Sequence, residues 1–167
     1  MSEPRQKRYA SKQDYETPWQ VVRALERRFG PFAVDLAASA QNKKAPLCFT
    51  EADNSLAQDW HKIGGVCWLN PPFANIAPWA DKCAYESEAG AKIVMLTPAS
   101  VSTDWFMRHV HGVARVVFLR PRITFVGADT PYPKDLMLTL WGVEEPGYEP
   151  WSWATQPSLF EVPHDPR

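Results

Sequence analysis

The chain has 167 residues, of which 45% are hydrophobic and 22% are charged, and its formal net charge is −1. This composition is typical of a globular protein, and the length suits a single domain with its own core. The near-neutral charge excludes a strong overall attraction to nucleic acid, although basic residues form local clusters. Because no apolar run approaches the roughly 20 residues that span a bilayer, and no apolar signal core is present, we expect a cytoplasmic protein without a membrane partner.

The first element in chain order is a polar, basic segment at residues 1–13, which we interpret as a flexible arm. A helix is predicted next, with Thr17 as its N-cap, Pro18 at the first helical position and Gln20 completing a capping box. Apolar residues at helical spacing extend this helix to Phe29.

Short apolar runs follow and are typical of strands buried on both faces. They lie at 32–37, 66–69, 92–96, 115–119 and 136–141, and helical patterns at 76–89 and 102–110 separate several of them. Alternation of strand and helix predicts the α/β class, with an open, doubly wound, mostly parallel sheet and helices on both faces. We therefore place one domain at 14–142, and expect the proline-rich residues 143–167 to form an irregular tail.

Cysteine and histidine spacing gives no indication of a metal site. The three cysteines form no CxxC pair, and the four histidines are not placed at the spacing of metal ligands. We expect free thiols and no metal.

A polar amide, two prolines and an aromatic residue follow the apolar run at 66–69: Asn70, Pro71, Pro72 and Phe73. Ligands of open α/β sheets bind beyond the carboxyl ends of the strands, where this tetrapeptide would lie. The amide oxygen of Asn70 and the carbonyl of Pro71 could accept both hydrogens of an exocyclic amine, while Phe73 offers a face for stacking a planar ring. The alternative is a stiff turn, since the chain contains 16 prolines.

The tetrapeptide Asn-Pro-Pro-Phe resembles the catalytic motif of amino-methyltransferases that use S-adenosylmethionine. The ordered series DYETPW, VDLAAS, EADNSLAQDW, WLNPPF, IVMLTPAS and PRITF resembles the phage-type DNA N-6-adenine methyltransferases, a Dam-like family. This resemblance covers about Asp14 to Trp141. It implies a Rossmann-like fold, S-adenosylmethionine as cofactor, DNA as partner, and methylation of the 6-amino group of a flipped-out adenine.

The resemblance also assigns roles to residues. It places Tyr15, Thr17, Pro18 and Trp19 in an amino-terminal cofactor segment, Asp35 and Ala37 beside the methionine part of the cofactor, Asp53 near its ribose or adenine, and Asn70, Pro71, Pro72 and Phe73 around the target adenine. Each assignment has an alternative: Thr17 as a helix cap, a backbone or arginine partner for Asp35, and a solvated loop charge for Asp53. The turn after the first strand also lacks the glycines common in methyltransferases.

For the DNA contact, we predict the segment that follows the strand at 115–119. Arg120, Arg122, Phe125 and Lys134 would lie at the same sheet edge as the tetrapeptide and touch the duplex near the flipped base. Other functions remain open at this point: methylation of an RNA base or a protein glutamine, or DNA binding without catalysis. The recognised DNA sequence and the oligomeric state are also open.

Overall fold

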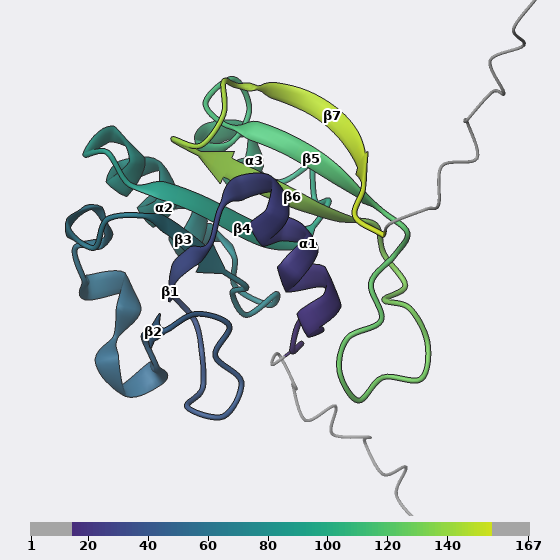
Figure 1. The fold of residues 1–167 in the computed structure, drawn as a ribbon. Helices are drawn as coiled ribbons and strands as arrows, with labels where there is room; N and C mark the ends of the chain where they lie inside the picture. The colour runs from purple at the N-terminus through teal and green to yellow at the C-terminus, as the bar shows by residue number, and fades with distance from the viewer. Residues whose placement is uncertain (1–14, 155–167) are drawn as a thin grey trace, which may run out of the picture.

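The computed structural model describes residues 15–154, which form a sheet flanked by helices (Figure 1). The α-helices are α1 Trp19–Phe29, α2 Ala77–Glu88 and α3 Asp104–His109. The strands are β1 Phe32–Asp35, β2 Leu47–Cys48, β3 Val66–Leu69, β4 Lys92–Pro98, β5 Arg115–Arg120, β6 Leu136–Trp141 and β7 Gly147–Ser152. Short 3-10 helices lie between β2 and β3, at Glu51–Asp53, Ser55–Ala57 and Trp60–Lys62.

The strand order β2-β1-β3-β4-β6-β5-β7 gives one seven-stranded sheet. Every pairing is parallel except those that β6 makes with β4 and β5, so β6 alone among the described strands runs in the opposite direction. From β1 the chain moves to β2 on one side and returns to β3 on the other, which creates a switch point at the carboxyl ends of β1 and β3. The predicted α/β class and mostly parallel sheet are confirmed.

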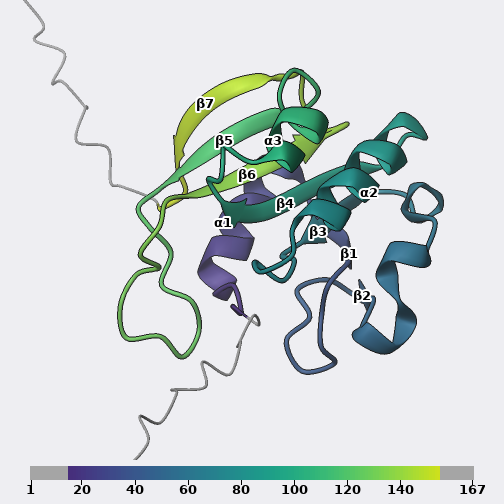
Figure 2. The same cartoon turned by 180° about the vertical axis from the view of Figure 1, so that it is seen from behind.

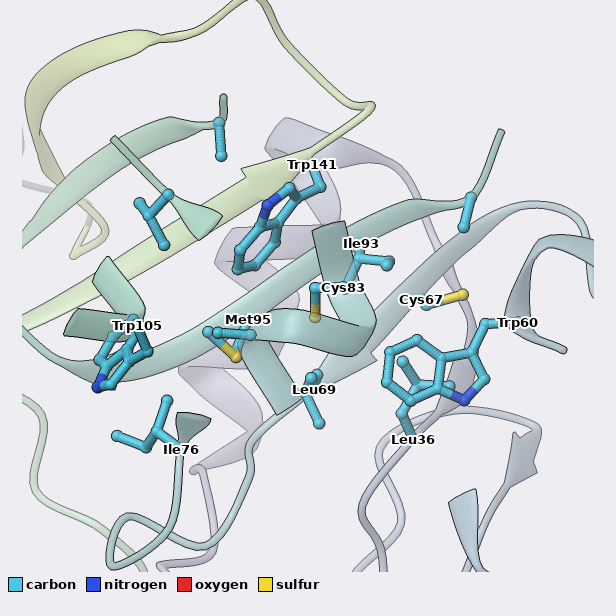
Figure 3. Packing of buried hydrophobic residues seen from close by; sticks show 14 of the residues in the cluster. Leu36, Trp60, Cys67, Leu69, Ile76, Cys83, Ile93, Met95, Trp105 and Trp141 are labelled. Carbon is cyan, nitrogen blue, oxygen red and sulfur yellow. The ribbon is translucent and has the colours of Figure 1, made fainter. Parts of the chain in front are cut away.

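Helices cover both faces of the sheet, as predicted. Helix α1 lies over one face in Figure 1, and α2 and α3 lie over the other in Figure 2. Side chains of α1 pack on one cluster of buried strand residues, while Cys83 of α2 and Trp105 of α3 belong to a second cluster that includes Trp141 (Figure 3). Because each central strand is apolar on both faces, each face requires its own helical cover.

The chain beyond residue 143 differs from the sequence prediction. Gly147–Ser152 form β7, which pairs in parallel with β5 along its whole length, so the predicted irregular conformation is wrong for these residues. Trp151 packs edge-on against Phe29 with 6.1 Å between ring centroids, and Glu149 pairs with Arg28. The strand forms because its backbone pairs with the edge of β5, and because Trp151 packs against Phe29 of α1. The predicted arm at 1–13 and the end of the tail lie outside the described residues.

Within residues 15–154, no helix is long and apolar enough to cross a membrane. In the same range, no group of three or more His, Cys, Asp or Glu side chains is arranged to hold a metal ion.

Candidate active site

A cavity of about 1160 Å³ opens at the carboxyl ends of β1 and β3. Its walls come from the residues before α1, the turn after β1, the segment after β2, the tetrapeptide after β3, and Trp79 of α2. The lining includes Tyr15, Glu16, Thr17, Asp35, Ala37, Lys44, Phe49, Ser55, Asn70, Pro72 and Trp79. Such a cavity is large enough for a ligand of several hundred daltons.

The carboxamide of Asn70 is held by the segment that precedes α1. Its Nδ2 donates to the backbone carbonyl of Tyr15 at 2.5 Å and to the hydroxyl of Thr17 at 3.2 Å. A carbonyl can only accept, so these contacts fix which side of the carboxamide carries the nitrogen. The opposite atom, Oδ1, is buried and has no hydrogen-bond partner among the described residues. A buried acceptor without a partner is available to accept a hydrogen bond from a ligand.

The helix-capping role that the sequence predicts for Thr17 is wrong. Helix α1 begins at Trp19 with Pro18 in the N-cap position, and no side chain caps it. Thr17 is 1% exposed, and its hydroxyl meets Asn70. The long-range contact therefore replaces the local one.

Phe73 belongs to an aromatic cluster rather than to an open wall. Tyr15 stacks on it with 5.2 Å between ring centroids and 29° between the planes, while Phe125 and Tyr132 meet its ring edge-on at 6.2 and 5.7 Å. The loop after β5 thus reaches the tetrapeptide, as expected from the shared sheet edge. The ring of Tyr15 occupies a position that a planar base would take when it stacks on Phe73.

Asp35 is buried at the end of β1, and among residues 15–154 its carboxylate accepts hydrogen bonds from backbone amides alone. Oδ2 accepts from the amide of Lys44 at 2.9 Å, and Oδ1 accepts from the amide of Ala37 at 3.3 Å. Burial raises the pKa of Asp35 to about 6, and these backbone hydrogen bonds lower it only in part. A nearby cation would stabilise the ionised form of such a buried carboxylate. Because Asp35 lines the cavity, a cationic ligand could reach it there.

The turn after β1 closes without glycine. The carboxamide Oδ1 of Asn42 accepts from the amide of Ser39 at 2.7 Å, and the amide of Ala38 donates to the carbonyl of Phe49. Among the described non-glycine residues, Asn54 alone has a positive φ, so residues 36–42 need no glycine. The small side chains of Ala37 and Ala38 leave room for the cavity.

Three residues of the predicted cofactor set do not line the cavity: Pro18, Trp19 and Asp53. The carboxylate of Asp53 accepts from both the amide and the hydroxyl of Thr50 at 2.7 Å, and these hydrogen bonds lower its pKa. The carboxylate of Asp53 therefore stabilises a local turn with Thr50. Trp19 is 48% exposed, with the ammonium of Lys44 4.7 Å from its ring centroid.

Sequence reasoning missed several lining residues. Lys44 is buried and forms an ion pair with Glu16 at 2.7 Å, which ties the segment before α1 to the loop after β1. The hydroxyl of Ser55 is a second buried polar group without a partner in the cavity wall. No local pattern predicts either residue, because Lys44 is defined by an ion pair with a residue distant in sequence, and Ser55 by its burial in the cavity wall. Phe49 and Trp79 add aromatic surface.

The four residues predicted to contact DNA lie in two environments. The side chains of Arg120, Arg122 and Lys134 are exposed, and Arg122 pairs with Asp135 at 3.0 Å. Phe125 is buried in the aromatic cluster, so it supports the loop from within instead of presenting its ring to solvent. A DNA contact by this loop remains a prediction.

Comparison with known proteins was made for the whole chain. Residues 5–137 match the family model described as DNA N-6-adenine-methyltransferase (Dam). The chain belongs to this family. Its tetrapeptide, the aromatic cluster and the cavity described above all lie within the matched residues.

Phage proteins of the Dam family are among the relatives. The DNA N-6-adenine-methyltransferase of Escherichia phage T1 is 33% identical over 110 residues, which are 66% of this chain and 46% of that protein. The protein of the same name from Haemophilus phage HP1 is 33% identical over 119 residues, or 70% of this chain and 68% of the relative. The chain thus spans about half the length of the phage T1 relative. The resemblance to the phage-type family is confirmed.

Proposed function

We propose that this protein transfers a methyl group from S-adenosylmethionine to the exocyclic 6-amino group of adenine in DNA. The observation that carries this proposal is the unpartnered Oδ1 of Asn70, an acceptor fixed at the cavity in a chain of the Dam family. A buried acceptor without a partner costs about 1–3 kcal/mol, and the amine of a substrate removes that cost.

The cavity fits S-adenosylmethionine in size and charge. When bound, this cofactor supplies a methyl group made electrophilic by a sulfonium centre. The Asp35 carboxylate would attract its cationic methionine part, Ala37 would leave room beside it, and the Ser55 hydroxyl would bind a polar group of the ribose or adenine. Phe49 and Trp79 offer apolar surface to the adenine ring.

Two acceptors would hold the target amine. The amide oxygen of Asn70 accepts one hydrogen and the carbonyl of Pro71 the other, which turns the nitrogen lone pair toward the methyl group. No other described residue donates a hydrogen bond to the Pro71 carbonyl, whereas the Pro72 carbonyl accepts from Asn75 at 3.2 Å. No base needs to remove a proton beforehand, because the neutral amine is itself the nucleophile. Phe73 would stack on the base once Tyr15 gives way.

DNA would bind along the edge that carries these groups. An adenine amine inside a duplex faces its pairing partner, so the base must be flipped out at a cost of a few kcal/mol. Arg120, Arg122 and Lys134 are exposed at the end of β5 and in the loop that follows it, whose Phe125 and Tyr132 contact Phe73, and they would offset this cost through phosphate contacts.

The test is to incubate the protein with methyl-labelled S-adenosylmethionine and, in parallel, with DNA, RNA or a glutamine-rich protein substrate. We expect label only in DNA, and nucleoside mass spectrometry should place it in N6-methyladenine. Label in RNA or in a protein side chain would replace the proposed substrate with one of those classes. Cofactor binding without transfer to any substrate would point to a non-catalytic relative.

A further inference from the structure

The carboxamide of Asn70 is oriented by groups that lie 55 and 53 residues earlier in the sequence. Asn70 follows β3, whereas its two partners, the carbonyl of Tyr15 and the hydroxyl of Thr17, precede α1. Both partners lie on the Nδ2 side. If the carboxamide were turned over, its oxygen would face the Tyr15 carbonyl, and two acceptors would meet without a proton between them.

We propose that Thr17 and the Tyr15 carbonyl position the Asn70 carboxamide so that its oxygen is the atom offered to the amine, and that they restrict this site to asparagine. The inference rests on the proposed function and extends it to a positioning residue. An aspartate could also accept from an amine, but here one of its oxygens would lie against the Tyr15 carbonyl at the distance of the present 2.5 Å hydrogen bond. A hydroxyl can rotate to donate, whereas a backbone carbonyl cannot.

The positioning segment is itself anchored. Glu16, between the two partners of Asn70, forms an ion pair with the buried Lys44 at 2.7 Å. The Glu16 carbonyl also accepts from the amide of Val126 at 3.0 Å. These two contacts hold Glu16 in place. They therefore keep the neighbouring carbonyl of Tyr15 within hydrogen-bonding distance of Asn70.

The first experiment compares Thr17→Val with Thr17→Ser. Valine has nearly the shape of threonine but no hydroxyl, so we expect kcat to fall roughly 10- to 100-fold from misplacement of Asn70. KM for DNA and S-adenosylmethionine affinity should change much less than kcat, because the Thr17 hydroxyl, although Thr17 lines the cavity, is the acceptor of a hydrogen bond from Asn70. Serine restores the acceptor and should recover most of kcat. Thr103→Val, at the start of α3, is the matched control and should leave kcat unchanged.

Two results would overturn the positioning role. Equal losses in the valine and serine variants would mean that the methyl group of Thr17, and not its hydroxyl, is what matters. A fall in cofactor affinity as large as the fall in kcat would return Thr17 to the cofactor site.

Asn70→Asp tests the restriction to asparagine. We expect this variant to lose activity about as completely as Asn70→Ala, roughly 100-fold or more in kcat, because the carboxylate is repelled from the productive position. Near-normal methylation by a folded Asn70→Asp variant would contradict the proposal. Melting temperatures of all variants establish that they are folded.

A readout without catalysis separates this inference from the proposed function. Nitrogen-15 NMR of the wild-type protein should show the Asn70 side-chain NH₂ protected from hydrogen exchange, with loss of protection in Thr17→Val and retention in Thr17→Ser. If wild-type protein methylated no adenine but gave this pattern, the proposed function would fail and the positioning would stand. If adenine were methylated but the NH₂ exchanged freely in wild type, the positioning would fail alone.

Discussion

Two regions of the molecule, the strand ends at the cavity and the neighbouring 3-10 segment, treat most of their polar groups in opposite ways. At the strand ends, Asp35 and Asn70 are enclosed by the sheet edge, and each retains hydrogen-bonding or charge capacity that the protein does not use. In the 3-10 segment, residues 51–62, Asp53 is satisfied by Thr50, and the amide of His61 is satisfied by Glu86 of α2. The unused capacity is therefore concentrated at the strand ends, and within residues 51–62 only the Ser55 hydroxyl is a buried side-chain group without a hydrogen-bond partner among the described residues.

The largest effect we expect is a loss of stability when the contact between the 3-10 segment and Glu86 of α2 is removed. Glu86 is fully buried, and although burial opposes its ionisation, hydrogen bonds from Lys82 and His61 lower its pKa overall. Glu86→Ala should reduce the free energy of unfolding by roughly 3 to 5 kcal/mol, because it opens a cavity at a fully buried side chain and leaves the part-buried donors of Lys82 and His61 without their acceptor. Urea denaturation measures this change, with the exposed Glu88→Ala on the same helix as control. A loss no larger than in the control would mean that the segment is held by apolar contacts alone.

Next in size is the dependence of stability on pH that Asp35 produces. Its pKa is about 6 in the folded protein, against an ordinary value of 3.8. Between these values the folded chain holds a proton that the unfolded chain has lost, so stability falls as pH rises through this window. Relative to Asp35→Asn, the wild-type free energy of unfolding should fall by on the order of 3 kcal/mol from pH 4 to above 6. Parallel pH profiles in the two proteins would show that Asp35 titrates normally.

The affinity for S-adenosylmethionine should also depend on the charge of the Asp35 carboxylate. Asp35→Asn keeps the size of the side chain but removes the charge, and we expect S-adenosylmethionine to bind roughly 10- to 100-fold more weakly, as for the loss of a hydrogen bond to a charged group. Wild-type affinity should also weaken below about pH 6, where Asp35 becomes neutral, and the variant should lack this dependence. Isothermal titration calorimetry measures both, and unchanged affinity would return Asp35 to a structural role.

The smallest effect should come from Asp53. Its carboxylate serves the Thr50 turn and lies outside the cavity lining, so Asp53→Ala should change S-adenosylmethionine affinity by no more than about twofold. A slight loss of thermal stability should accompany the loss of the turn. If this variant bound the cofactor as weakly as Asp35→Asn, the contrast between the two regions would be wrong.

The sequence predicted the parts of the fold that local pattern determines. Continuous apolar runs identified the central strands, and the polar tetrapeptide after one of them indicated the end of the cavity where we propose that the target amine binds. Strand β7 was not predicted because GYEPWS contains a glycine and a proline within a proline-rich stretch. It becomes a strand through its pairing with the edge of β5 and the contact of Trp151 with Phe29.

The contacts within the site could not be predicted for a related reason. Thr17, Pro18 and Gln20 fit a capping pattern, but burial of the Thr17 hydroxyl against Asn70 decided otherwise. The pairing of Lys44 with Glu16 joins residues 28 positions apart, which no local rule anticipates. Motif resemblance indicated the residues that we propose to meet the substrate, whereas the groups that orient Asn70 depend on tertiary packing.

The central claim is that the free oxygen of Asn70 holds the target amine, and one measurement tests it most directly. Wild type and Asn70→Ala are compared for methyl transfer from labelled S-adenosylmethionine to adenine-containing DNA, with cofactor affinity measured on the same samples. We predict that the variant binds the cofactor nearly as wild type does but transfers roughly 100-fold or more slowly, as when a preorganised hydrogen-bonding group is lost. Transfer at a near-normal rate by the folded variant would contradict the account.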